Sequence, residues 1–110
     1  MYNKLSKVAP VAVTGTNLTK ALASLQSWSV VDKSLTKDVV FPDFESTWGF
    51  LTQVSMRSHL WGHHPTITTT YNKVQLKLQT HDLENEISDI DIKMAKRIDR
   101  YIQMYGNLKG

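Results

Sequence analysis

The segment that most restricts the fold is a pair of β-prone stretches separated by a polar step. Residues 66–71 (Thr-Ile-Thr-Thr-Thr-Tyr) are β-branched or aromatic, and such side chains favour strands. Residues 73–79 then alternate, with Val or Leu on one face and Lys or Gln on the other. With Asn72-Lys73 as a tight turn, the pattern predicts an antiparallel hairpin that has one apolar and one wet face. The apolar face must be covered by other elements.

Helical patterns lie on both sides of this hairpin. Residues 17–26 carry Leu and Ala at helical spacing. The clearest helix spans roughly 43–61, where Asp43 is in position to cap the first turn. Gly62 ends this helix, and the proline three residues later prevents its resumption. A last helix is expected from about Ser88.

Two further strands are expected at 28–31 and 35–41, which gives the element order α-β-β-α-β-β-α. This order predicts the α+β class, with a four-stranded antiparallel sheet covered on one face by helices. We expect one domain at 17–105, an N-terminal arm at 1–16 and a C-terminal tail at 106–110.

The 43–61 helix is apolar on two sides. Met56 and Leu60 form a small second ridge, which suggests contact with another subunit, although a slightly apolar surface helix remains the alternative. The broader stripe is expected to face the core, and it consists of Phe44, Trp48, Phe50, Leu51, Val54 and Trp61.

Composition excludes several classes of protein. The chain has 110 residues and no Cys, so it can form no disulfide and no thiolate metal site or nucleophile. No apolar run approaches the roughly 20 residues of a membrane helix, and no membrane partner is expected. No acidic residue precedes Asp32, a weak sign of a mitochondrial presequence, but Pro10 interrupts any long amphipathic helix there. We expect a cytoplasmic protein, with a mitochondrial location as the second choice and a nuclear one possible.

The net charge of +3 is a mild excess and does not by itself predict a nucleic-acid partner. Lys93, Lys96, Arg97 and Arg100 share one face of the last helix. Asp89 precedes Lys93 by four residues, as in an ordinary solvated helix face. We therefore expect no binding to nucleic acid.

All four histidines fall within residues 59–81, near the ends of predicted elements. Histidine ionises near neutral pH, so a group of them can serve as general acid and general base. His59 and His63 also have the i, i+4 spacing of zinc ligands. Gly62 interrupts that spacing, Leu60 stands where a zinc-protease Glu would be, and Cys is missing. We predict acid–base chemistry and no metal.

The residues around these histidines resemble the signature of the pterin-4a-carbinolamine dehydratase family. The resemblance runs from about Leu22 to Ile102. It rests on His63-His64-Pro65, Tyr71-Asn72-Lys73-Val74, Thr80-His81 and Asp91, together with Phe41-Pro42-Asp43-Phe44 and Gly49-Phe50-Leu51-Thr52-Gln53-Val54.

The resemblance implies a hydro-lyase that converts 4a-hydroxytetrahydropterin, such as 4a-hydroxytetrahydrobiopterin, to quinonoid dihydropterin without a cofactor. It implies that His63, His64 and His81 are catalytic, with His64 or His81 favoured as proton donor. The residues it places near the substrate are His59, Pro65, Asp91 and Trp28. For two of these the sequence leaves alternatives: Asp91 either bonds a histidine or caps the last helix, and Trp28 is either a pocket or a core residue.

The chain departs from the family pattern at three places. His59 and Gly62 stand where relatives have acidic residues, and Thr66-Ile67 replaces an acidic-aromatic pair. The alternative function is therefore a catalytically weak paralogue that acts as an interaction or dimerization cofactor through its long helix. The resemblance and the second apolar ridge together predict a homo-oligomer, a dimer or tetramer, and leave a heterologous protein partner possible.

Overall fold

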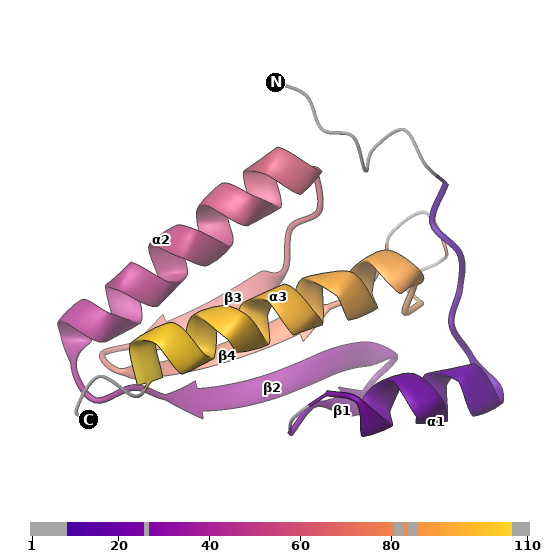
Figure 1. Cartoon of the computed structure of the whole chain (residues 1–110), viewed down its shortest axis with the longest axis horizontal. Helices are drawn as coiled ribbons and strands as arrows, with labels where there is room; N and C mark the ends of the chain where they lie inside the picture. Colours follow the sequence, from indigo (N-terminus) through magenta and orange to yellow (C-terminus); the bar gives the residue numbers. More distant parts are fainter. Residues whose placement is uncertain (1–8, 26, 81–82, 84–85, 107–110) are drawn as a thin grey trace.

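The structure is a computed structural model, and it confirms the predicted element order and the α+β class. The described residues are 9–25, 27–80, 83 and 86–106. The elements in chain order are α1 (Gly15–Ala23), β1 (Ser29–Val31), β2 (Ser34–Val40), α2 (Phe44–Trp61), β3 (Thr66–Thr70), β4 (Lys73–Leu78) and α3 (Asp89–Gly106), as shown in Figure 1.

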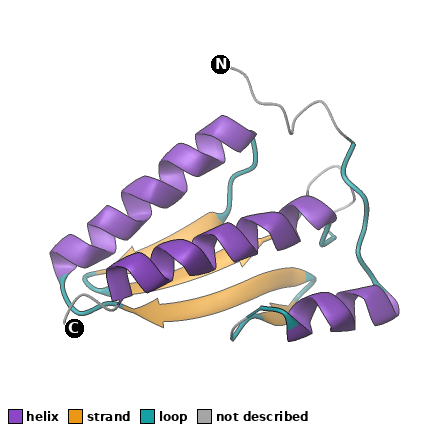
Figure 2. Ribbon diagram, in the orientation of Figure 1, coloured by secondary structure: helices purple, strands orange, loops and turns teal. Residues whose placement is uncertain are grey.

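The four strands form one antiparallel sheet in the order β1-β2-β4-β3. Figure 2 shows α2 and α3 lying across the same face of this sheet. The β3–β4 turn falls one residue earlier than expected, because Lys73 already pairs with Thr70. Tyr71 therefore occupies the turn, with φ 53°. The side chain of Asn72 donates to the carbonyl oxygen of Phe41 at 2.8 Å, which ties this turn to the end of β2.

The core lies between the helix-covered face of the sheet and the inner faces of α2 and α3. The alternation predicted for β4 is confirmed, since its three aliphatic side chains are at most 2% exposed. Burial of such side chains is the main driving force for the layered packing. The buried hydrophobic residues of the central strands and the two long helices are Leu35, Val74, Leu76, Leu78, Phe50, Leu51, Val54, Met94, Ala95, Ile98 and Tyr101.

The prediction that Phe44 and Trp48 belong to the core stripe of α2 is wrong. They are 51% and 47% exposed, whereas Met56 and Leu60 are exposed as expected, at 64% and 45%. These four residues share one i, i+4 row along the helix, interrupted only by Thr52. The structure turns this whole row away from the core.

The exposed row of α2 faces outward because α3 packs against a neighbouring row of the same helix. Three contacts follow one another along the two helices: Tyr105 covers Gly49 and bonds Gln53, Tyr101 bonds Arg57, and Arg97 lies over Trp61. Because α3 occupies this row, the row that begins at Phe44 must face outward. Helix α3 itself buries Met94, Ile98 and Tyr101 as predicted, while Ile102 and Tyr105 are half-buried.

Residues 11–13, which fall within the expected N-terminal arm, pair with the start of α3. The Val13 N–H donates to Ile87 O at 3.0 Å, and the Asp89 N–H donates to Val11 O at 2.9 Å. This pairing fixes the N-terminal end of α3. Over the described ranges, no helix has both the length and the apolar character needed to cross a membrane.

Candidate active site

The centre of the candidate site is a close pair formed by His63 and Asp91. His63 Nε2 lies 2.5 Å from Asp91 Oδ1, although 28 residues separate them in the chain. The Asp91 side chain is fully buried, whereas the His63 side chain keeps 14% of its surface exposed. The histidine is therefore held on a buried carboxylate and still faces the outside.

The second oxygen of Asp91 is bonded inside the protein. Asp91 Oδ2 accepts from Thr80 Oγ1 at 2.8 Å and from the Ser88 backbone N–H at 2.9 Å. The Thr80 and Ser88 hydroxyls also lie 2.6 Å from each other. A buried carboxylate needs such partners, because burial without them is costly. This network holds Asp91 in one orientation toward His63.

Both alternatives that the sequence leaves for Asp91 hold at once. Ser88 is the N-cap of α3, since its carbonyl accepts the first helical bond, from Ile92 N at 3.2 Å. Asp91 stands three residues later and bonds back to the Ser88 N–H, as the acidic residue of a capping box does. One oxygen therefore caps the helix while the other holds the histidine.

The end of α2 brings His63 to this carboxylate. Gly62 adopts φ 66° and ψ 28°, the left-handed conformation that glycine enters without steric cost. The His63 N–H then donates to Ser58 O at 3.1 Å, which completes a Schellman-type helix end. Gly62 thus redirects the chain toward α3.

The other predicted residues of this segment lie close to His63 in the chain. His64 follows His63 and is exposed, and Pro65 is half-buried just before β3. His59 is exposed in the last turn of α2. Among the described residues, no three His, Asp or Glu side chains form a group that could hold a metal ion.

His81 lies outside the described residues, so its predicted catalytic role stays a prediction. Its neighbour Thr80 is described and buried, and donates to Asp91. Thr80 also pairs with Glu86 across the loop that leads to α3. The chain thus enters the loop from a residue that belongs to the carboxylate network.

Trp28 is buried in a different environment. Its indole N–H donates to Asp99 Oδ1 at 2.9 Å, and the same oxygen accepts from Lys37 Nζ at 2.9 Å. Asp99 follows Asp91 by eight residues, about 12 Å along the axis of α3. Trp28 thus packs in the core and joins β2 to α3, and its role toward a substrate stays a prediction.

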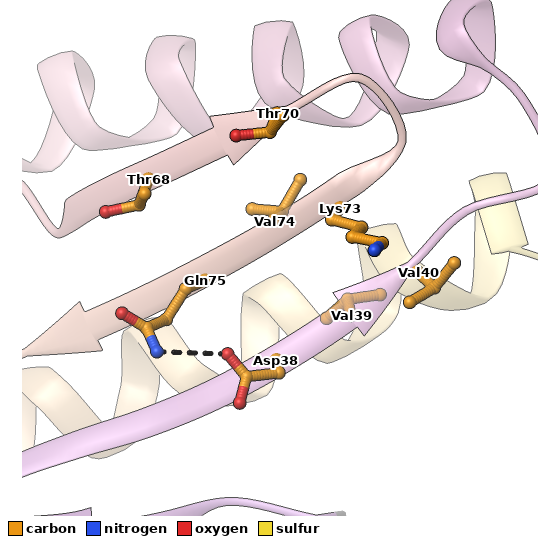
Figure 3. A pocket seen from close by; sticks show the side chains of 8 residues that line it. All are labelled: Asp38, Val39, Val40, Thr68, Thr70, Lys73, Val74 and Gln75. Atoms are coloured by element: carbon orange, nitrogen blue, oxygen red, sulfur yellow. Dashed lines mark hydrogen bonds between the residues drawn. The ribbon is translucent and has the colours of Figure 1, made fainter.

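Figure 3 shows a separate shallow pocket on the sheet, with a hydrogen bond of 3.1 Å from Gln75 Nε2 to Asp38 Oδ1. None of the predicted site residues lines it. Its lining residues lie toward the β3–β4 turn, whereas Pro65 and Thr80 lie at the opposite ends of those strands. The lining residues are Asp38, Val39, Val40, Thr68, Thr70, Lys73, Val74 and Gln75.

The sequence placed Ser88 at the start of the last helix and Thr80 beside His81, but it gave neither residue a role in holding Asp91. For Ser88, the spacing Ser-x-x-Asp at a helix start is a readable signal of a capping box. For Thr80 no local signal exists, because its bond to Asp91 depends on how β4 meets α3.

Comparison with known proteins shows which family this chain resembles. The family model described as Pterin 4 alpha carbinolamine dehydratase matches residues 11–101. A protein of Saccharomyces cerevisiae named "Putative pterin-4-alpha-carbinolamine dehydratase" is 49% identical over 115 aligned positions, which cover 93% of this chain and 96% of that protein.

Two solved structures of pterin dehydratase-type proteins are also similar to this chain. A crystal structure from Brucella melitensis, described as a transcriptional coactivator/pterin dehydratase, has a TM-score of 0.78 and 33% identity, covering 82% of this chain and 97% of that one. A pterin dehydratase-like protein identified as a RuBisCO assembly factor in the alpha-carboxysome has a TM-score of 0.61 and 25% identity, covering 69% of this chain and 89% of that one. The chain therefore belongs to the pterin-4a-carbinolamine dehydratase family.

Proposed function

We propose that the protein dehydrates a 4a-hydroxytetrahydropterin to quinonoid dihydropterin by histidine acid–base catalysis. The observation that carries the proposal is the His63–Asp91 pair, in a chain that belongs to this family. The reaction breaks the bond from ring carbon 4a to its hydroxyl, and the leaving oxygen takes up a proton to become water. A ring N–H loses its proton, and its electron pair forms the new double bond. No oxidant is required.

The geometry suits His63 to the role of general base. A carboxylate that accepts from one ring nitrogen fixes the tautomer, so that the other nitrogen can take a proton. Here Nε2 faces Asp91, which leaves Nδ1 to receive the ring proton. His64 or His81 would then supply the proton to the leaving hydroxyl. His59, Pro65 and Asp91 would border the substrate, with Trp28 supporting from the core.

A turnover assay on the carbinolamine tests this proposal. Removal of one proton-transfer group should lower turnover by about 10²–10⁴-fold. We expect losses of this size in His63→Ala, His64→Ala and His81→Ala, with unchanged far-ultraviolet circular dichroism. The control Lys96→Ala changes an exposed side chain on the outer face of α3 and should retain activity. Parental turnover no faster than the buffer rate, or full activity in all three histidine variants, would refute the proposal.

We also propose that the exposed row of α2 packs against a second copy of this chain. Phe44, Trp48, Met56 and Leu60 are four large apolar side chains on one helix, each at least 45% exposed. Sixteen residues separate the first from the last, so the row extends about 24 Å. A soluble monomer rarely leaves a row of four large apolar side chains open to water.

The same row supports the second candidate function, an interaction protein that acts through its long helix. One structural relative is itself described as an assembly factor. If this function holds, Met56→Glu should abolish co-purification of a heterologous partner while pterin turnover persists. Loss of turnover in the same variant, with no partner recovered from the parent, would count against it.

A further inference from the structure

Two arginine side chains from different helices converge on one indole ring beside the candidate active site. The guanidinium carbon of Arg57, on α2, lies 5.4 Å from the centroid of the Trp61 ring. That of Arg97, on α3, lies 5.8 Å from the same centroid. Trp61 is the last residue of α2 and precedes His63 by only two residues. The ring that both arginines contact therefore belongs to the helix end that leads directly to His63.

Neither guanidinium is neutralised by a carboxylate among the described residues. Arg57 donates through Nε to the Tyr101 hydroxyl at 3.1 Å, which fixes its position and leaves its terminal nitrogens available. Arg97 lies over the ring and makes no hydrogen bond or ion pair with the described part of the chain. A guanidinium over an aromatic ring directs its N–H groups outward, in its own plane. Both guanidinium groups thus lie at the same ring, and no carboxylate of the described residues pairs with them.

Most of the charged residues within four positions of Arg57 and Arg97 in the chain are positive. Helix α2 has no acidic residue after Glu45. Lys93 lies one turn before Arg97 on α3. The acidic residue nearest to Arg97 on α3, Asp99, accepts from Trp28 Nε1 and Lys37 Nζ. Asp91, six residues before Arg97, is bonded by His63, Thr80 and Ser88. Two cations held close together repel each other unless an anion binds between them.

We propose that Arg57 and Arg97 bind the phosphate group of a small phosphorylated ligand. Arginine forks match the oxygens of phosphate in two parallel hydrogen bonds, and such charge-assisted bonds are among the stronger polar contacts in proteins. The Trp61 indole ring supplies the apolar surface against which both guanidinium groups lie. Taken with the proposed dehydratase function, on which this extension rests, the substrate is a pterin whose side chain carries a phosphate. The ring would lie at His63 and the phosphate at the arginines.

Isothermal titration with inorganic phosphate at low ionic strength tests the site without any turnover. We expect saturable binding that weakens by about tenfold or more in Arg57→Gln and Arg97→Gln, because each variant loses a charge-assisted contact. Arg100→Gln removes an exposed arginine three residues further along α3 and is the matched control, so it should bind as the parent does. Arg97→Lys keeps the positive charge but loses the paired N–H donors of the guanidinium group, so it should bind phosphate with intermediate affinity.

Absence of saturable binding, or equal weakening in Arg97→Gln and Arg100→Gln, would overturn the proposal, because it would indicate only a diffuse basic surface. A single-stranded oligonucleotide that binds more tightly than phosphate, and depends equally on Lys96 and Arg100, would overturn it in favour of a nucleic-acid partner. Melting temperatures of all variants exclude unfolding as the cause of any loss.

Competition between two carbinolamine substrates separates this inference from the proposed function. We expect the parent to prefer a phosphorylated pterin over its uncharged analogue, through a lower KM. The ratio of the KM for the uncharged analogue to the KM for the phosphorylated pterin should fall toward one in Arg97→Gln. The same ratio should be unchanged in Arg100→Gln. If neither substrate is turned over while phosphate still binds through Arg57 and Arg97, the dehydratase proposal fails and the phosphate site stands. Equal KM values in the parent would refute the phosphorylated pterin as substrate.

Discussion

The two carboxylate oxygens of Asp91 have different roles, so replacing Asp91 should affect both stability and catalysis. Asp91 is fully buried, and one oxygen caps α3 while the other holds His63. In Asp91→Asn, an amide N–H₂ replaces one of the two acceptor oxygens, so it either faces the Thr80 and Ser88 donors or requires His63 to change tautomer. We expect the free energy of unfolding to fall by about 1–3 kcal/mol, the typical cost of leaving a buried polar group unsatisfied.

The same variant should also lower kcat more than it raises KM, because Asp91 acts by positioning His63. The loss should stay within about 10²–10⁴-fold, the range for an acid–base group itself. Asp89→Asn is the control, since Asp89 is an exposed carboxylate two residues earlier on α3. Steady-state kinetics and thermal unfolding measure the two effects. A kcat equal to that of the parent would show that the carboxylate serves only the helix.

Asp43 is the N-cap of α2, as predicted, and its effect on stability should depend on pH. Its side chain accepts from the Ser46 backbone N–H at 2.7 Å. This bond holds the pKa of the Asp43 carboxyl below its ordinary value of 3.8, with a smaller contribution from the Ser46 side chain. A carboxyl with a lowered folded-state pKa stabilises the fold above its unfolded pKa, and this contribution is lost as pH falls through the folded pKa.

We therefore expect Asp43→Ala to have a lower melting temperature than the parent at pH 7. The difference should shrink as pH falls below 3.8. Asp43→Asn keeps a good capping side chain without a titratable group, so its melting temperature should show less of this pH dependence. Melting curves recorded from pH 7 to pH 2 provide the comparison. A parent–alanine difference that stays constant over this range would contradict the expectation.

At the scale of elements, the packing of α2 against α3 depends on the absence of a side chain at Gly49. A Cβ placed there would lie 2.5 Å from Cε1 of Tyr105, closer than atoms can approach. Gly49→Ala would stabilise an isolated helix by about 1 kcal/mol, while overpacking costs about 1–3 kcal/mol. We expect net destabilisation, measured as a lower melting temperature.

The matched background for this variant is Tyr105→Ala, which removes the obstructing ring. Without the ring, Gly49→Ala should become stabilising by about 1 kcal/mol, because only the helix propensity remains. The two substitutions should therefore couple in a double-mutant cycle. Purely additive effects would show that α3 does not press on Gly49.

At the scale of the whole molecule, we expect association through the exposed row of α2. Light scattering at micromolar concentration should give a multiple of the 12.5 kDa chain mass. Met56→Glu should reduce this mass, because it places a charge in the middle of the apolar row. Ser55→Glu adds the same charge at an exposed position outside the row and should leave the mass unchanged. A parental mass of one chain would refute association.

The sequence alone determined the features that depend on neighbours in the chain. The alternation in β4, the cap at Asp43 and the helix end at Gly62 were all predicted, because each follows from a local period or from the conformation of a single residue. Together they predicted the element order and the α+β class. The sequence also singled out the histidine segment, because its motif is contiguous, and the catalytic role of that segment stays a prediction.

The tertiary structure alone decided which side of α2 is buried and what His63 contacts. Phe44 and Trp48 are as apolar as the core residues of the same helix, so hydrophobicity could not separate the two sides. The packing of α3 over Gly49 decides that. The bond between His63 and Asp91 joins residues 28 positions apart, and only the fold brings them together. Local forces act over a few residues, whereas burial and long-range pairing depend on how the layers pack.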